Sequence, residues 1–540
     1  MLNSSEPYLR DLSYRGFVEG LTIKNKSSGT PLCHYFGGIP YALPPTGLFR
    51  WRKPRPLPSC FRYGTRANPG RYVGGTGVCP QPGFGKEVDE SRWEEDCLQC
   101  NVWMPVGEAE GGKGWPVVFY IHGGFLQFGS PNGSNLSSLL SETACKCIFV
   151  MPAYRLNLFG FLASRELCLD SESPELAPNA GFWDQRLALE WTLKNISYFG
   201  GNASNITIAG YSAGAHSVFH QLAYDLGVPD SKSVVKRAIM WSNGPGLQPK
   251  SLMEAQEQFD ELLYSLKIKK NLSSLEKLAK LRSLDPKTLV KASLGLKYHQ
   301  FRAVTDSSFV RPSLFQEIDN GAFARQMKRR GVKLMIGECR DEHFVYGTWR
   351  PPKNSFADLF KRLQADYPRV ACEALMDYYY PNGRLPDDCE DWIDAFGRIY
   401  ADIQIHALER GLVNALVQHE AGDLIFRYRV EWRAKCVDER VPEKWGVTHG
   451  TDMAIWFWGN GSVLNDAEKT IVKHAFHKQL AKYVNGEELD WGTTEPLHLR
   501  RLTPKGIIKC GKDENLEKGL EIWRILQRVG ATSGLMGAKL

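Results

Sequence analysis

The sequence lacks the features that mark a membrane-spanning or exported protein. It contains no run of about eighteen apolar residues, the length that a membrane-spanning helix needs. Residues 1–20 carry charged side chains throughout and no apolar core, so they do not form a signal peptide. We therefore expect no membrane span and no secretion.

Neither sign of charge dominates the composition. Lys and Arg number 67 and Asp and Glu number 60, which gives a formal net charge of +7 over 540 residues. The basic clusters at 50–55 and 328–330 lack the regularly interleaved aromatic residues that nucleic-acid-binding surfaces use. The sequence therefore predicts no nucleic-acid partner.

Cysteine is present without regular spacing. The 13 cysteines form no repeated pattern, which is typical of reduced thiols inside a cell. Cys79 and Cys97 stand apart, because an oxidised bridge between them closes a loop of about 19 residues and contributes ~3 kcal/mol. In a reducing compartment we expect both to be free thiols.

A complete metal-binding motif is also missing. His216 and His220 have the i, i+4 spacing of a metal-binding pair, but the Glu of an H-E-x-x-H motif and further nearby ligands are lacking. We expect no metal and no cofactor.

The last three residues are similar to a peroxisomal address. Ala538, Lys539 and Leu540 match the C-terminal S-K-L signal except for Ala in place of Ser, and residues 533–537 before them suit an accessible tail. We expect the peroxisome or the cytoplasm as the compartment, with the peroxisomal import receptor as a partner in the first case.

One pentapeptide organises the rest of the chain. An alternating apolar run at 206–209 leads into G-Y-S-A-G at 210–214, and helical apolar spacing follows at 218–223. In this strand, corner and helix context, glycines two positions either side of the serine avoid a Cβ collision with the crossing elements. Ser212 is thus the predicted nucleophile, at a helix N-terminus that favours developing negative charge. The alternative is a serine that only caps the helix.

A second glycine-rich turn follows a buried strand. The apolar run at 116–121 predicts a parallel core strand, which ends in H-G-G-F at 122–125. In α/β-hydrolases such a loop supplies backbone N–H donors to an oxyanion, together with the residue after the nucleophile. Here the expected donors are Gly124, Phe125 and Ala213, with Phe125 in the place of the usual third glycine.

The order of elements predicts an α/β fold of the α/β-hydrolase kind, with a mostly parallel central sheet flanked by helices. Strands at 116–121 and 148–152, a helix at 179–201 and the strand before Ser212 alternate as crossover units do. Helical insertions at about 245–331 and 356–418 are expected over the active-site edge of the sheet. We expect one domain over residues 1–540.

A nucleophile needs a base and an acid, expected in the chain order Ser, acid, His. His449 is the predicted base, because it lies in a loop flanked by glycines. Asp341 and Glu342 both follow the core strand at 333–337. The residues alone leave the choice of acid open.

Seven motifs occur in a fixed order along the chain. They are F-G-G-I-P-Y-A-L-P-P-T-G-L-F-R (36–50), E-D-C-L-Q-C-N-V (95–102), H-G-G-F (122–125), N-A-G-F-W-D-Q (179–185), G-Y-S-A-G (210–214), I-G-E-C-R-D-E (336–342) and H-G-T-D (449–452). Over nearly the whole length they resemble the type-B carboxylesterase/lipase family, which includes the cholinesterases, and its intracellular fungal-type members in particular. The resemblance implies Ser212 as nucleophile, Glu342 as acid and His449 as general base.

The resemblance also implies features around the triad. It pairs Arg50 with Glu95 and Arg155 with Asp184 as structural ion pairs. It places Ser242 in a supporting position behind the triad.

Two departures from the family pattern bear on the substrate. Tyr211 replaces the Glu that usually precedes the nucleophile, and no residue matches the choline-binding Trp of cholinesterases. We therefore expect a small, neutral, hydrophobic carboxylic ester, in a pocket bounded by Tyr211, Leu126, Phe128 and neighbouring aromatic residues.

Other functions use the same acyl-enzyme chemistry. A thioesterase, a lactonase or a transacylase of a biosynthetic, secondary-metabolite pathway is the main alternative to an esterase. A non-catalytic cholinesterase-like binding protein is a further alternative, and the retention of all three triad candidates counts against it.

Overall fold

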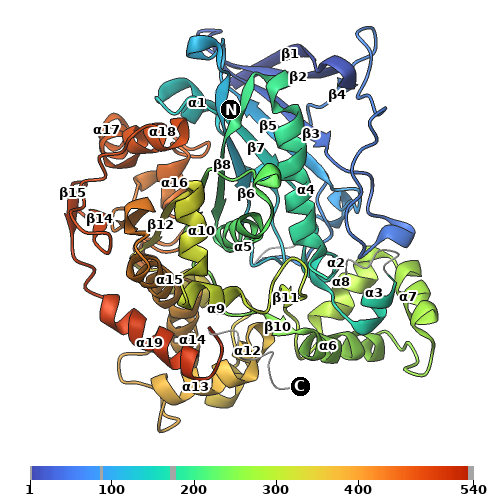
Figure 1. Cartoon of the computed structure of the whole chain (residues 1–540), viewed down its shortest axis with the longest axis vertical. Coiled ribbons are helices and arrows are strands. Elements are labelled where there is room, and N and C mark those ends of the chain that lie inside the picture. The colour runs from blue at the N-terminus through green and yellow to red at the C-terminus, as the bar shows by residue number, and fades with distance from the viewer. Residues whose placement is uncertain (1–2, 85–88, 171–177, 533–540) are drawn as a thin grey trace.

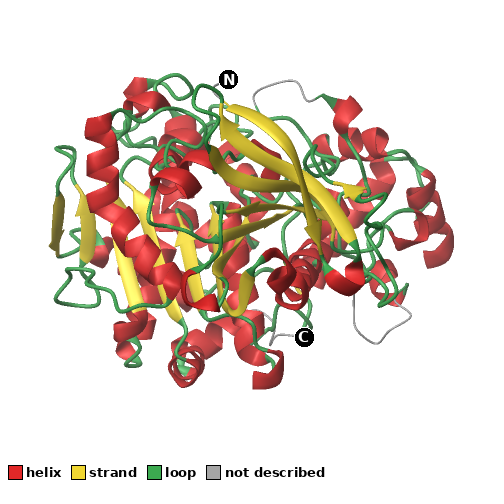
Figure 2. Cartoon of the chain, turned by 90° about the horizontal axis from the view of Figure 1, so that it is seen from above, coloured by secondary structure: helices red, strands yellow, loops and turns green. Residues whose placement is uncertain are grey.

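The computed structural model describes residues 3–84, 89–170 and 178–532. Within these ranges thirteen strands form one twisted sheet, which Figure 2 shows from above. Its order is β1-β2-β3-β5-β7-β6-β8-β9-β12-β13-β14-β15, with β4 paired to β2. The strands are β1 (Asn3–Asp11), β2 (Phe17–Asn25), β3 (Pro31–Pro40), β4 (Gly70–Arg71), β5 (Gln99–Met104), β6 (Trp115–Ile121), β7 (Ile148–Pro152), β8 (Gly201–Tyr211), β9 (Arg237–Trp241), β12 (Lys333–Cys339), β13 (Ile425–Val430), β14 (Leu499–Leu502) and β15 (Ile508–Gly511).

The centre of the sheet is parallel. Neighbouring strands from β7 to β14 run in the same direction. The pairs at the two margins are antiparallel, except for the short parallel pair of β2 and β4. A separate short pair, β10 (Lys250–Ser251) and β11 (Val304–Thr305), lies outside the sheet. The predicted α/β class with a mostly parallel central sheet is confirmed.

Helices cover both faces of this sheet. On one face α4 (Ala180–Asn195) and α5 (Ala213–Gly227) pack against β6 and β8, and on the other α18 (Lys478–Asn485) packs against the same strands. The remaining helices outside the insertions are short or lie near the C-terminus: α1 (Ser137–Glu142), α2 (Asn157–Phe161), α3 (Arg165–Leu169), α11 (His343–Tyr346), α16 (Met453–Trp456), α17 (Asp466–Val472) and α19 (Leu516–Arg528).

Side-chain alternation along β8 explains why both of its faces are buried. Ile206 and Ile208 join the hydrophobic cluster that contains α4 and α5, whereas Ala209 and Tyr211 join the cluster that contains α18. A strand with period two that is apolar on both faces is the pattern of a central parallel strand. The residue before Ser212 therefore points away from α5.

Helices fill the two spans in which insertions are expected. The first holds α6 (Leu252–Ser265), α7 (Ser274–Ser283), α8 (Pro286–Leu294), α9 (Leu314–Asp319) and α10 (Ala322–Arg330). The second holds α12 (Phe356–Asp366), α13 (Arg369–Tyr379), α14 (Trp392–Ala401), a π-helical turn (Asp402–His406) and α15 (Ala407–Gln418). Most of these helices lie in the lower half of Figure 1, below α5. Within the described ranges, no helix combines the length and the apolar character that crossing a membrane requires.

Both ion pairs implied by the resemblance are present. Arg50 Nε donates to Glu95 Oε2 at 2.7 Å, and Arg155 Nη2 donates to Asp184 Oδ1 at 2.7 Å. The second pair is almost completely buried. Removal of one partner alone would leave an uncompensated buried charge, so the pair holds the loop after β7 to α4.

The expectation of free thiols at Cys79 and Cys97 is wrong, because the structure joins them in a disulfide. Their Cα atoms lie 5.4 Å apart and both side chains are buried, so the fold itself brings the two sulfurs together. The sequence singles out this pair, and the error lies in the expected oxidation state.

Replacing Cys79 and Cys97 together with Ala should lower the free energy of unfolding by about 3 kcal/mol, since the bridge restricts the unfolded chain. Urea denaturation in the presence and absence of a thiol reductant measures the effect. Reductant should destabilise the unaltered protein and leave the double variant unchanged. Equal stability of the unaltered protein with and without reductant would contradict the bridge.

Candidate active site

Ser212 occupies the sharp corner between β8 and α5. Its backbone angles are φ 57° and ψ −127°, a conformation that few non-glycine residues adopt. Its N–H donates to the carbonyl of Trp241 at 2.9 Å, which fixes the corner to the neighbouring strand β9. Strain of this kind persists only where the surroundings over-determine the backbone, as they do at a nucleophile.

The two flanking glycines are sterically required. A Cβ on Gly210 would lie 2.3 Å from the backbone of Gly214, and a Cβ on Gly214 would lie 2.0 Å from the carbonyl oxygen of Ile121. Both distances are far shorter than any contact that a real Cβ makes. The collision that the sequence predicted on each side of Ser212 is therefore real, with α5 and with β6.

Glu342 and His449 form a hydrogen-bonded pair at the carboxyl edge of the sheet. His449 Nδ1 and Glu342 Oε2 are 2.7 Å apart, and the other carboxylate oxygen accepts the N–H of Cys339 at 2.8 Å. Glu342 is fully buried and His449 nearly so. These contacts lock the orientation of the imidazole.

Asp341, the alternative acid, faces elsewhere. Its carboxylate binds Arg340 at 2.8 Å and accepts the N–H of Val447 at 2.8 Å. Between the two carboxylates that the sequence left open, the geometry brings Glu342 to the histidine.

The second nitrogen of the imidazole is left without a partner. His449 Nε2 is buried and makes no hydrogen bond to any described residue, Ser212 included. The ring lies between Tyr211 and Tyr346, with centroids 5.0 and 4.9 Å away. Burial raises the pKa of Tyr346 well above its ordinary value, and the Ser212 hydroxyl has a smaller effect in the opposite direction. The imidazole is thus in contact with both tyrosine rings, and its unpartnered nitrogen is available as a base.

The loop after β6 presents unpaired amides beside Ser212. A Cβ on Gly123 would lie 2.9 Å from the Cβ of Ser212, so the loop passes directly over the serine. Among the described residues, no acceptor takes the N–H groups of Gly124, Phe125 or Ala213. Backbone amides that lack partners at such a position are what an oxyanion hole consists of.

Phe125 adopts a left-handed backbone conformation with φ 57°, between Gly124 at 113° and Leu126 at 63°. This conformation costs a non-glycine residue about 1–3 kcal/mol. Ring packing offsets it, because Phe125 stacks on Trp349 at 5.3 Å and meets Tyr346 edge-on at 5.7 Å. The ring therefore keeps the loop in the shape that a third glycine would otherwise allow.

Comparison with known proteins shows the family to which the chain belongs. The model of the carboxylesterase family matches residues 7–489. A carboxylic ester hydrolase of Gibberella moniliformis is 47% identical over 532 residues, which cover 97% of each chain. The mouse cholinesterase is 29% identical over 459 residues, 78% of this chain and 70% of its own length. The chain belongs to the carboxylesterase family. The predictions of the family and of an enzyme of the carboxylic ester hydrolase class are confirmed.

A solved structure shares the fold of this chain. The crystal structure of Aspergillus niger EstA superposes with a TM-score of 0.74 at 22% sequence identity, over 97% of this chain and 99% of EstA. At this identity the likeness concerns the fold alone. It confirms the predicted α/β-hydrolase architecture.

The pocket residues expected from the sequence occupy different surroundings. Phe128 lies in an aromatic cluster with Phe84, Phe125 and Trp349. Its ring centroid is 4.8 Å from that of Trp349 and 5.1 Å from that of Phe84. Leu126 is fully buried behind the loop, where its carbonyl accepts the N–H of Asn157. Only Phe128, with its neighbour Phe125, belongs to the aromatic cluster.

Tyr211 holds the histidine loop of this carboxylesterase-family chain. Its hydroxyl donates to Asp452 Oδ1 at 3.0 Å and accepts the N–H of Gly450. Gly450 directly follows His449, so the residue before the nucleophile is tied to the residue after the base. The substitution of Tyr for the usual Glu thus has a structural consequence on the face of β8 opposite α5.

Asp452 is a site residue that the sequence reasoning missed. It is fully buried, its Oδ2 accepts from Trp456 Nε1 at 3.0 Å, and Ser242 Oγ lies 3.5 Å away. Ser242 thereby takes the supporting position that the resemblance implied. Asp452 is the last residue of the H-G-T-D motif, so the motif pointed to Asp452 as a site residue. The partner could not be read from the sequence, because Tyr211 lies 241 positions away.

The pKa of Asp452 is raised to about 6 by burial and by the neighbouring Glu342. A raised carboxyl pKa stabilises the folded state below the ordinary value of 3.8, and this contribution is lost as pH rises through about 6. Replacing Asp452 with Asn removes the titration. The free energy of unfolding of the variant, relative to the unaltered protein, should rise by about 3 kcal/mol between pH 4 and pH 7.

Urea denaturation across this pH range measures the effect. The exposed Asp377 provides the control, because its replacement with Asn should leave the pH dependence of stability unchanged. A difference between the Asp452→Asn variant and the unaltered protein that stays constant with pH would contradict the raised pKa.

Of the histidine pair on α5, His220 is buried and His216 is partly buried. The rings of His216 and His220 are 4.6 Å apart. Burial lowers the pKa of His216 to about 3 and that of His220 well below its ordinary value. In the described part of the chain, no group of three or more His, Cys, Asp or Glu is arranged to hold a metal ion. The C-terminal tripeptide at 538–540 lies outside the described residues, and peroxisomal import stays a prediction.

Proposed function

We propose that this member of the carboxylesterase family is a serine esterase that hydrolyses small, neutral, hydrophobic carboxylic esters through an acyl-enzyme intermediate. The observation that carries the proposal is the 2.7 Å contact between Glu342 and His449, which leaves Nε2 unpartnered on a loop tied to the strained corner of Ser212. Each of the three side chains then has a chemical role that its surroundings support.

The reaction begins with proton transfer. His449 Nε2 takes the proton of Ser212 as the serine oxygen attacks the ester carbonyl, and Glu342 stabilises the imidazolium that forms. The imidazolium then gives the proton to the departing alcohol. In the second half, His449 activates a water molecule that attacks the acyl-enzyme, and Ser212 leaves with the proton restored.

The carbonyl oxygen carries negative charge in both halves of the reaction. The N–H groups of Gly124, Phe125 and Ala213 lie beside Ser212 and are free to donate to this carbonyl oxygen. Each such donor contributes about 3 kcal/mol to transition-state stabilisation. Because the donors belong to the backbone, the side chain at position 125 does not remove the hole.

The walls beside this loop favour an uncharged substrate. Rings of Phe84, Phe125, Phe128 and Trp349 pack together there. Burial of an apolar acyl or alkyl group against them is favourable. The position before Ser212 carries Tyr rather than Glu, and its hydroxyl is engaged with Asp452.

A substrate panel tests the proposal. Purified protein is assayed with p-nitrophenyl esters of increasing acyl length, a choline ester, acyl-CoA thioesters and lactones. We expect the highest kcat/KM for neutral p-nitrophenyl esters and a value at least about tenfold lower for the choline ester, a difference of ~1.4 kcal/mol. A preference for acyl-CoA or lactones would replace the esterase proposal by a thioesterase or lactonase. Absence of turnover on the whole panel would indicate a binding protein.

A further inference from the structure

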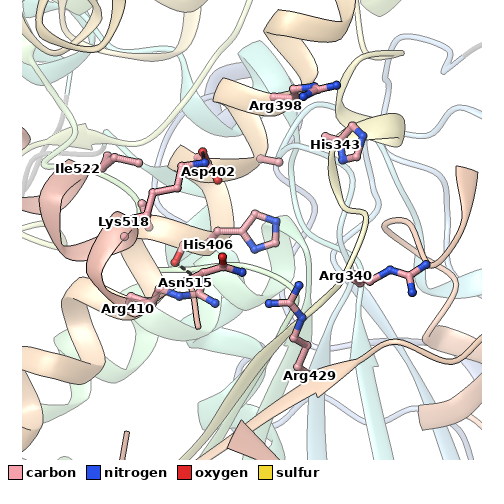
Figure 3. Close-up of a pocket in the computed structure, with 13 residues that line it drawn as sticks. Arg340, His343, Arg398, Asp402, His406, Arg410, Arg429, Asn515, Lys518 and Ile522 are labelled. Carbon is pink, nitrogen blue, oxygen red and sulfur yellow. Dashed lines mark hydrogen bonds and ion pairs between the residues drawn. The ribbon is translucent and has the colours of Figure 1, made fainter. Parts of the chain in front are cut away.

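A second cavity lies apart from the triad. It has a volume of about 330 Å³ and lies among the end of α14, the following π-helical turn, α15 and α19. Figure 3 shows side chains from these elements and from β13 converging on it. Neither Ser212, Glu342 nor His449 lines it. Its volume is within the range of sites for small molecules.

Cations dominate the walls of this cavity. The fixed positive charges are Arg340, Arg398, Arg410, Arg429 and Lys518, and the lining contains one carboxylate, Asp402. The other carboxylates that pair with these cations stand behind the walls. A ligand in the cavity therefore meets guanidinium and ammonium groups first.

One buried carboxylate, that of Glu338, pairs with several of the groups that line the cavity. Glu338 is fully buried and is shared by three cationic partners, Arg410 at 2.9 Å, Arg429 at 3.1 Å and His406. Arg410 also pairs with Asp513 at 2.9 Å. Asp513 and Glu431 supply further carboxylates to Arg410 and Arg429, so the network is paired on its inner side. On the cavity side, the charged lining consists of guanidinium, ammonium and imidazole groups with one carboxylate.

Two nitrogen atoms in the wall make no hydrogen bond to a described residue. Arg429 Nε is buried and makes no hydrogen bond, although Glu431 lies 3.3 Å away. Burial lowers the pKa of His406, but the Glu338 carboxylate outweighs it, and the net shift is upward. The Nδ1 of His406 faces Glu338, which leaves its Nε2 with no described partner. In Figure 3, His406 and Arg429 point toward each other across the lower part of the cavity.

One wall is apolar. Ala401, Ala407 and Ile522 contribute it. An inorganic ion alone would leave this surface uncovered, whereas an organic molecule with one charged end covers it. Arginine forks bind phosphate in a bidentate manner, and several cations together favour a dianion over a carboxylate.

We propose that this cavity binds a small organic phosphate monoester, with the phosphate at Arg429 and His406 and the apolar body against the wall formed by α15 and α19. The site is independent of the esterase reaction. It holds whether or not Ser212 acts as a nucleophile.

Calorimetric titration with phenyl phosphate tests the site. Arg398 and Lys518 line the cavity but are partly exposed, with side-chain exposures of 38% and 55%, so their replacement leaves the buried Glu338 network in place. Phenyl phosphate should bind the unaltered protein. Affinity should fall by about tenfold or more in the double variant Arg398→Gln, Lys518→Gln.

The matched control is the double variant Arg329→Gln, Lys469→Gln. These two side chains also pair with carboxylates, Asp230 and Glu142, on surfaces outside the cavity. The control removes the same charge and frees carboxylates in the same way, so its affinity should stay within about twofold of the unaltered protein. Equal loss in both double variants would overturn the site.

A measurement without variants locates the ligand. Phenyl phosphate should protect Arg429 from modification by phenylglyoxal, as read by peptide mass spectrometry, and should leave Arg329 reactive. Three results would overturn the proposal: no binding of phenyl phosphate, no protection of Arg429, or benzoate binding as tightly as phenyl phosphate.

Discussion

Replacing Ser212 with Ala should lower kcat for a p-nitrophenyl ester by about 10⁴-fold or more without loss of folding. Among the residues that the structure describes, only Ser212 combines a hydroxyl with the strained corner, the helix N-terminus and the unpaired amides of the loop after β6. Alanine fits the same backbone, since the conformation is held by the glycines on either side and by the N–H contact to Trp241. The change therefore removes the nucleophile and little else.

Steady-state kinetics and thermal unfolding of the same preparation separate the two effects. Ser217→Ala is the matched control, because Ser217 is a buried serine one turn further along α5 that donates to the carbonyl of Ala213. It should retain activity within a few-fold. Turnover of Ser212→Ala near that of the unaltered protein would retire the proposed nucleophile.

Replacing Glu342 with Gln should lower kcat by about 10⁴-fold. One carboxylate oxygen accepts the N–H of Cys339, so the amide oxygen of a glutamine stays at that position. The NH₂ group then faces His449 Nδ1 and donates to it. His449 must then accept at Nδ1 and carry its proton on Nε2, which disables the base.

Asp341→Asn provides the control for this prediction. Asp341 has the same chemistry one position earlier in the chain, but it contacts Arg340 and the N–H of Val447 rather than the imidazole. Its replacement should leave kcat within a few-fold. Equal losses in the two variants, or a larger loss in Asp341→Asn, would contradict the assignment of the acid.

The local chemistry of the corner was predictable because it is set by near neighbours. Glycines at 210 and 214 imply steric crowding around Ser212, and the structure shows that crowding with Gly214 itself and with Ile121. The alternation of side chains along β8 also predicts which face of the sheet Tyr211 lies on, because Tyr211 is out of phase with Ile206 and Ile208. That phase, read strictly, excludes Tyr211 from the face of the sheet that carries α5.

Long-range contacts were beyond the sequence. The sequence singled out Cys79 and Cys97 as a pair, but it did not show that the fold brings their sulfurs into bonding distance. The left-handed conformation of Phe125 depends on rings from distant segments, Phe84, Trp349 and Tyr400. The choice between Asp341 and Glu342 came from the resemblance and not from the residues, because adjacent carboxylates differ only in where the chain turns after β12.

Chemical labelling of the nucleophile tests the central claim most directly. The protein is treated with a fluorophosphonate, digested, and mapped by mass spectrometry, with the Glu342→Gln variant in parallel. We predict a single adduct on the peptide that contains Ser212, formed much more slowly in the variant. An unlabelled Ser212, or an adduct that forms on another serine, would contradict the proposed catalytic triad.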